Sequence, residues 1–142
     1  MTNSQYSKLV QLAMALARYA HDGQKYGEHD YFEYHVMGVA ESVCGNENYC
    51  EDLHITALLH DVVEDTDLAL NDIYSLFSHD VYMAISHITR DPENTYEDYI
   101  KIVGFNDMAS KVKIADLKFN LSQPKSKNKK KYRKALAYLE GR

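Results

Sequence analysis

The stretch LLHDVVEDTD, residues 58–67, combines an apolar segment with one histidine and several carboxylates. Its leucines and valines are typical of a helix that packs in a core, whereas isolated charges are costly to bury. His60 and Glu64 are four residues apart, as are Asp61 and Asp65, so on a helix these four polar groups would lie on one side. We expect one continuous helix over Leu53–Glu64. A bound cation would offset the charge of this cluster.

Apolar residues recur at helical spacing almost everywhere else, and no segment alternates with a period of two. We expect the segment between Gly23 and His35 to be a loop. The sequence predicts an all-α fold with one domain over residues 1–142, which ends in a basic helix at about 125–142. The other expected helices are Leu9–Asp22, Val36–Gly45, a short helix capped by Asn71, one capped by Asp80 that ends near Ile88, Thr95–Gly104, 107–121 and Asn128–Leu139.

Charge is distributed unevenly along the chain. Residues 125–142 hold eight of the 16 Lys and Arg and one of the 21 acids, a net charge of +7, which leaves −12 for residues 1–124. We interpret the basic run KSKNKKKYRK, residues 125–134, chiefly as a solvated linker and the outer face of the last helix. Alternatively, its charge could steer a polyphosphate substrate towards an acidic protein or bind nucleic acid through the phosphates. Nucleic acid is disfavoured as a partner because no aromatic platform for base stacking accompanies the run.

The chain shows no pattern of a signal peptide and no apolar segment of about 20 residues that would span a membrane. Cys44 and Cys50, the two cysteines, are not spaced as a CxxC motif, and we expect them to be free thiols. Free thiols are typical of a reducing compartment, so the expected location is the cytoplasm.

Two further residues are candidate partners for a metal ion held by His60 and Asp61. His35 opens the predicted second helix, and Asp116 is a lone carboxylate in the core-like phrase VKIADLKFN. Each residue alone could instead be a capping histidine or an aspartate on a polar helix face. The metalloprotease pattern HExxH is missing, so that class of site is excluded.

These residues carry a resemblance to a known family. The order H…HDxxED…D resembles the HD-domain metal-dependent phosphohydrolases, and longer phrases are similar to the hydrolase domains of RelA/SpoT enzymes and to small stand-alone alarmone hydrolases. The matching phrases cover most of residues 9–122 in the family order. They are AHDGQKYG (20–27), YFEYHVMGVA (31–40), ALLHDVVEDT (57–66), ISHITRDPENTYEDYI (85–100) and KVKIADLKFNLS (111–122).

The resemblance implies an HD-domain helical bundle with one divalent metal ion, usually Mn²⁺. The implied reaction removes the 3′-pyrophosphate from guanosine tetra- or pentaphosphate, a small nucleotide of the ppGpp type. The implied metal ligands are His35, His60, Asp61 and Asp116.

The resemblance also implies roles around the metal ion. Glu64 and Asp65 match a pair that orients or activates the attacking water, and which of the two is the base stays open. Lys25, Arg90 and Asn120 stand at or near positions that contact substrate in the family. Imidazole and carboxylate ligands independently suit a first-row divalent ion, which would lower the pKa of a bound water.

The chain also departs from the family pattern. Tyr26 follows Lys25 where alarmone hydrolases usually have a second cation, and Leu117 follows Asp116 where the family often has Arg or Lys. Two alternatives therefore stay open. One is an HD phosphohydrolase that acts on another nucleotide, such as NADPH or a nucleoside triphosphate, and the other is a non-catalytic module that binds nucleotide or nucleic acid.

Overall fold

The computed structural model describes residues 5–45 and 48–142, and in these ranges the chain is helical apart from one small hairpin, which confirms the predicted all-α class. The strands β1 (Lys25–Tyr26) and β2 (His29–Asp30) form this hairpin. The helices are α1 (Lys8–Ala20), the π-helix η2 (Tyr31–Val36), α2 (Met37–Cys44), α3 (Glu51–Leu59), α4 (Val62–Asp65), α5 (Leu70–Leu76), α6 (His79–Ile88), α7 (Tyr96–Val103), α8 (Asp107–Ser122) and α9 (Lys129–Glu140).

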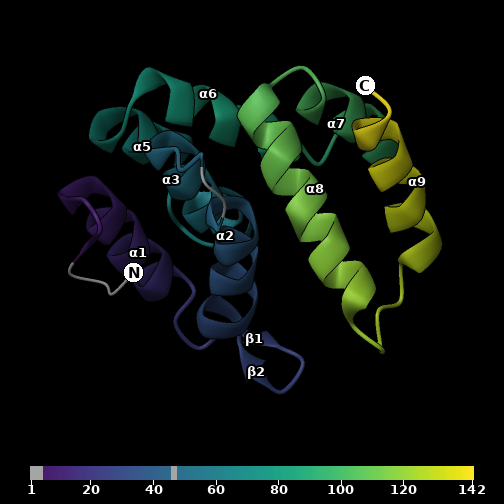
Figure 1. Ribbon diagram of the computed structural model, residues 1–142, viewed down its shortest axis with the longest axis horizontal. Helices are drawn as coiled ribbons and strands as arrows, with labels where there is room; N and C mark the ends of the chain where they lie inside the picture. Colours follow the sequence, from purple (N-terminus) through teal and green to yellow (C-terminus); the bar gives the residue numbers. More distant parts are fainter. Residues whose placement is uncertain (1–4, 46–47) are drawn as a thin grey trace.

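Helix α3 is the central element of the bundle. It packs against α1, α2, α6 and α8, and every residue from His54 to Leu59 is buried. A helix whose residues are mostly apolar and buried has to be enclosed by others. Figure 1 shows α8 crossing the front of the molecule, with α9 along one side of it and the hairpin at the end of the bundle opposite α5, α6 and α7. No helix in the described ranges is both long and apolar enough to cross a membrane.

Several helix starts follow from side-chain caps. Thr95 Oγ1 accepts the Asp98 N–H at 3.1 Å, as the sequence predicts. The expected caps Asp80 and Asn71 are wrong. Ser78 caps α6 by accepting the Val81 N–H at 3.1 Å, because its backbone is still extended while that of Asp80 is already helical.

The start of α5 differs from the prediction in a similar way. This helix begins at Leu70, so Asn71 lies inside it. The carboxylate of Asp72 folds back and accepts the Ala69 N–H at 2.9 Å. This bond satisfies a backbone donor just before the helix starts, so the cap comes from Asp72 and not from Asn71.

The predicted continuous helix over Leu53–Glu64 is also wrong, because the chain breaks at His60 and Asp61 between α3 and α4. His60 Nδ1 lies 2.6 Å from the Ala57 carbonyl oxygen. In a continuing α-helix that oxygen would accept the Asp61 N–H, so the imidazole takes the acceptor that the next turn needs. Asp61 instead has φ −110° and ψ −2° and starts the short helix α4.

The segment expected to be a loop is more ordered than its sequence indicates. The hairpin pairs Lys25 with Asp30, and its turn contains Gly27 at φ +61°, a conformation that glycine adopts without strain. The Asp30 carboxylate then accepts the Glu33 N–H at 2.9 Å and caps η2. The π-helix was not predicted, and such segments occur frequently at functional sites.

Candidate metal centre and pocket

Three segments of the chain bring the predicted metal ligands together. His35 comes from η2, His60 and Asp61 from the break between α3 and α4, and Asp116 from the middle of α8. One donor atom from each residue lies within 4.8 Å of all the others. His35, His60 and Asp116 are buried, whereas Asp61 is partly exposed. Residues far apart in the sequence therefore converge on one point.

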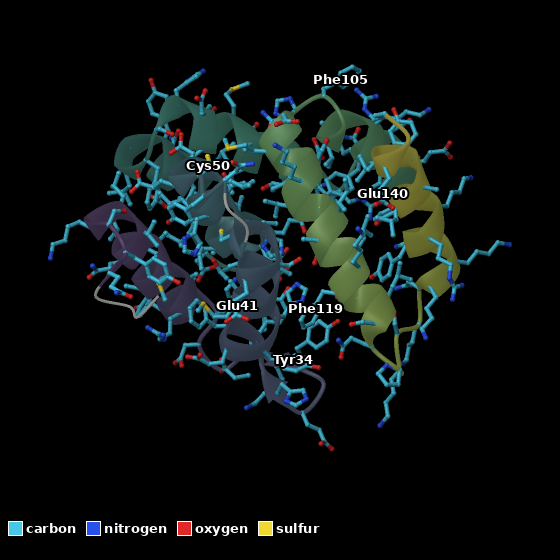
Figure 2. All side chains as sticks on the ribbon, in the orientation of Figure 1. Tyr34, Glu41, Cys50, Phe105, Phe119 and Glu140 are labelled. Atoms are coloured by element: carbon cyan, nitrogen blue, oxygen red, sulfur yellow. The ribbon has the colours of Figure 1, made fainter. Side chains whose placement is uncertain are left out.

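A close approach of two helices fixes the orientation of His35. The ring of Phe119 in α8 packs edge-on against the His35 ring, with ring centroids 4.9 Å apart, and also against Tyr34 at 5.3 Å. Figure 2 shows Phe119 and Tyr34 facing each other beside the hairpin. A Cβ on Gly38 would lie 2.5 Å from the Phe119 ring, so glycine at this position lets α8 approach α2.

Nitrogen and oxygen atoms face one another in the cluster. His35 Nε2 lies 2.9 Å from Asp116 Oδ1, and His60 Nε2 lies 3.0 Å from Asp61 Oδ2. The cross distances are 3.5 Å from His35 Nε2 to Asp61 Oδ2 and 3.6 Å from His60 Nε2 to Asp116 Oδ1. Both imidazoles thus point their Nε2 atoms at both carboxylates.

Charge in the cluster is strongly coupled. Burial alone would lower the pKa of His60, but the carboxylates of Asp61 and Asp116 outweigh it and raise this pKa well above 6.5. Burial would likewise raise the pKa of Asp61, but His60 and His35 lower it. Without a metal ion, the two carboxylates therefore favour the protonated form of His60.

The donor set fits one divalent cation. His60 Nδ1 faces a carbonyl oxygen, so in the neutral imidazole Nδ1 carries the proton and Nε2 presents a lone pair to the carboxylates. Within the described residues, His60 Nε2 has no hydrogen-bond partner although it is buried. Ligands on opposite sides of a small divalent ion lie about 4.2 Å apart. The spread of the four donors, 4.8 Å, is close to that separation.

Lys113, one turn before Asp116 on α8, was not predicted as part of the site. Its Nζ lies 3.0 Å from Asp116 Oδ2, while Oδ1 of the same carboxylate faces the histidines. Burial would lower the pKa of Lys113, but Asp116 raises it well above its ordinary value. Lys113 therefore stays charged and leaves one Asp116 oxygen free for a metal ion. The i, i+3 spacing of the two residues was the available sequence signal.

Two tyrosines orient the ligands from the hairpin side. The Tyr31 hydroxyl donates to Asp61 Oδ2, the oxygen that faces both histidines. The Tyr26 ring stacks on His35 with 4.9 Å between centroids, and its hydroxyl donates to Asn120 Oδ1 at 2.6 Å. Asn120 Nδ2 in turn lies 3.4 Å from Asp116 Oδ1. Asn120, predicted to contact substrate, already has both polar groups engaged.

Glu64 and Asp65 lie beside the four ligands, on the wall of the same pocket. The Glu64 carboxylate accepts the backbone N–H of Arg90, and Asp65 Oδ2 accepts from Gln24 Nε2 at 3.2 Å. Packing around the Glu64 carboxyl raises its pKa above the ordinary value, although the Arg90 N–H opposes the shift. A raised pKa of this kind suits a carboxylate that accepts a proton near neutral pH.

A pocket of about 670 Å³ opens above this cluster. Of the predicted substrate contacts, Asn120 lines it, whereas Lys25 and Arg90 do not. Lys25 is exposed on β1, and the Arg90 guanidinium donates to the Asn94 carbonyl oxygen at 3.0 Å. The structure therefore places both of these cations away from the pocket, and a hydrogen bond already engages the Arg90 guanidinium.

The architecture defines a class of fold. It is an all-α bundle with a fold like that of the HD-domain RelA/SpoT hydrolases, as the sequence resemblance indicated. A solved structure of a metazoan ortholog of SpoT superposes with a TM-score of 0.76 at 25% sequence identity. The match covers 94% of this chain and 86% of that protein, which is described as hydrolysing ppGpp and acting in starvation responses. Comparisons of the sequence with protein-family profiles and with curated proteins find no match.

Proposed function

We propose that the chain is a metal-dependent pyrophosphohydrolase that removes the 3′-pyrophosphate from guanosine tetra- or pentaphosphate. The observation that carries the proposal is the convergence of His35, His60, Asp61 and Asp116 in one cluster, which we name the floor of the pocket. All of these residues except His60 line the 670 Å³ pocket, and Glu64 and Asp65 line it beside them. The SpoT ortholog supports it, because that protein shares the fold and is described as hydrolysing ppGpp.

His35, His60, Asp61 and Asp116 would hold the ion, for which Mn²⁺ is the proposed identity. When bound, a divalent cation supplies Lewis acidity that polarises a phosphoryl oxygen and makes a bound water more acidic. Tyr31 holds the Asp61 carboxylate, and Lys113 holds the outer oxygen of Asp116. Fixed ligand orientations of this kind reduce the reorganisation that binding requires.

Glu64 is the proposed proton acceptor for the attacking water. The raised pKa of Glu64 lies closer to physiological pH than that of an ordinary glutamate, which favours proton transfer from water. The N–H of Arg90 fixes one Glu64 oxygen, so the carboxylate keeps a single orientation. Asp65, held by Gln24, would hydrogen-bond the same water and align it.

A second substrate class has an observation of its own. Tyr26 occupies the place of a family cation, and its hydroxyl is bonded to Asn120, so the hairpin offers the pocket an aromatic ring rather than a positive charge. This arrangement favours a second candidate function, in which the same site hydrolyses NADPH or a nucleoside triphosphate.

A substrate panel separates the two candidates. The wild-type chain would be incubated with Mn²⁺ and, separately, guanosine tetraphosphate, NADPH and GTP, and the products would be resolved by ion-exchange chromatography. We expect pyrophosphate and guanosine 5′-diphosphate from the tetraphosphate and no comparable turnover of the others. Preferential turnover of NADPH or GTP would replace the proposed substrate, and no turnover of any of the three would remove the proposed activity.

We further propose that residues 1–142 form one domain and that the protein acts in the cytoplasm. The two cysteines are free thiols, Cys44 half-buried and Cys50 exposed, which suits a reducing compartment. Burial raises the pKa of the Cys44 thiol to about 12, so this cysteine is not a reactive thiolate at neutral pH.

A further inference from the structure

A guanosine polyphosphate carries several negative charges, but much of the described pocket lining is acidic. Five carboxylates line it, and they outnumber the three lysine ammonium groups there. A single divalent ion would bring the sum of these charges only to zero. The acids are Glu28, Asp61, Glu64, Asp65 and Asp116, and the lysines are Lys113, Lys125 and Lys127.

Lys113 is committed to the floor of the pocket. Its ammonium group pairs with Asp116 at 3.0 Å, and its side chain is only 15% exposed. Its charge is therefore engaged by the carboxylate of a predicted metal ligand and is not free to pair with a substrate phosphate. Lys125 and Lys127 remain as the exposed lysines among the described pocket-lining residues.

Both of these lysines lie in the segment that joins α8 to α9. Helix α8 ends just before Pro124, and α9 begins after Asn128. All residues from 123 to 128 line the pocket. We name residues 123–128 the basic loop. In the described part of the chain, neither Lys125 nor Lys127 forms an ion pair with a carboxylate, so both ammonium groups are available to an anion.

The rest of the basic run faces elsewhere. Lys131 lies over the Tyr96 ring at 4.2 Å, and together with Lys134 it lines a separate cleft between α7 and α9. Lys130 and Arg133 are exposed on α9 and line neither cavity. The sequence presents these cations as one run, but the fold turns only its first part towards the pocket.

We propose that Lys125 and Lys127 of the basic loop bind the phosphate groups of the substrate and so take over the role of the cation that Tyr26 replaces. This inference deepens the proposed function and rests on it. The loop and the hairpin line the same pocket, with Gly27 and His29 on one side and Lys125 and Lys127 among the other lining residues. In this proposal, two lysines near the C-terminus of the sequence supply the positive charge that the hairpin lacks at Tyr26.

The test compares two double variants that remove the same charge. Lys125→Ala/Lys127→Ala removes the pocket-lining pair, and Lys130→Ala/Arg133→Ala removes an exposed pair from the same basic run. The KM and kcat for guanosine tetraphosphate would be measured for both and for the wild type, at a fixed free Mn²⁺ concentration. Binding of inorganic triphosphate would be measured by equilibrium dialysis under the same conditions.

We expect the loop variant to raise KM about tenfold and to leave kcat within about twofold, because two exposed charges assist binding more than chemistry. Its affinity for triphosphate should fall by a similar factor, whereas the control variant should change both quantities by less than about twofold. Unchanged triphosphate affinity in the loop variant, or an equal loss in the control, overturns the inference.

The dialysis arm separates this inference from the proposed reaction. If the wild type does not hydrolyse guanosine tetraphosphate but the loop variant still loses triphosphate affinity, the basic loop is a phosphate-binding segment and only the reaction is wrong. If the wild type hydrolyses the nucleotide and the loop variant keeps its KM, the reaction stands and the role of Lys125 and Lys127 is excluded.

Discussion

The floor and the rim of the pocket are built in different ways. At the floor, His35, His60 and Asp116 are at most 5% exposed and come from helices that pack in the core. We name Lys125 and Lys127 of the basic loop the rim of the pocket. Both lysines are exposed and lie in the connection between α8 and α9. The floor has every donor directed at one point, whereas the rim offers charges that a ligand can meet in several geometries. We therefore propose that chemistry that needs fixed atoms takes place at the floor and that the rim contributes to recognition.

The largest expected effect comes from removing a floor carboxylate. Asp61→Ala removes a predicted metal ligand and the acceptor of the Tyr31 hydroxyl, so turnover should fall by at least about a thousandfold. The control is Asp67→Ala, an exposed aspartate that does not line the pocket. Steady-state hydrolysis of guanosine tetraphosphate measures both, and similar rates for the two variants would contradict the division between floor and rim.

Glu64 and Asp65 lie between the floor and the rim, and their variants separate two roles. Glu64→Gln should lower kcat by about 10²–10⁴-fold, because an amide cannot accept the proton. Asp65→Asn should cost less, since an amide can still hydrogen-bond a water. Mn²⁺ affinity, measured by calorimetry, should stay near the wild-type value in both. A larger loss in the Asp65 variant would reverse the assignment of the base.

The floor should also dominate stability in the metal-free protein. Lys113→Met leaves the buried Asp116 carboxylate without its ammonium partner, so the free energy of unfolding should fall by about 3–5 kcal/mol. Lys111→Met on the same helix breaks an exposed pair with Asp107, where the two side chains are 59% and 83% exposed, and should change it by less than about 0.5 kcal/mol. Urea unfolding with a chelator measures both, and equal effects would contradict a buried, coupled floor.

A smaller effect concerns the proton on His60. Because its pKa in the folded, metal-free protein is raised above 6.5, the pairing with the carboxylates stabilises the fold fully below that value and is lost as pH rises through the higher folded pKa. At pH 7, Mn²⁺ must therefore displace a proton. Calorimetric titrations in buffers of different ionisation enthalpy should give different apparent enthalpies. Identical enthalpies would show that no proton leaves.

The floor was largely accessible from the sequence, and the rim was not. Helical periodicity and the HDVVEDT phrase located His60, Asp61 and the neighbouring carboxylates, because buried polar groups in apolar helices are conspicuous. The break at His60 was missed because it depends on a side chain that captures the Ala57 carbonyl, which periodicity does not reveal. The four ligands converge in the structure, but their role as ligands remains a prediction.

Other residues needed the tertiary structure. Lys113 resembles an ordinary lysine on an amphipathic helix, and only its burial beside Asp116 shows that it belongs to the floor. The basic run looks uniform in the sequence, whereas the turn after Pro124 directs Lys125 and Lys127 to the pocket and Lys131 to Tyr96. Arg90 and Lys25 were predicted to contact substrate and lie away from the pocket lining, so their role stays a prediction without support from the geometry.

The most direct test of the metal-ion assignment is a titration of the metal-free protein with Mn²⁺. Electron paramagnetic resonance would follow the loss of the free-ion signal, and hydrolysis of guanosine tetraphosphate would be measured on the same samples. We expect one ion per chain, with turnover rising in proportion to occupancy, and no tight binding by His35→Ala. Full turnover without bound ion, or unchanged binding by the His35 variant, would contradict a metal centre at the floor of the pocket.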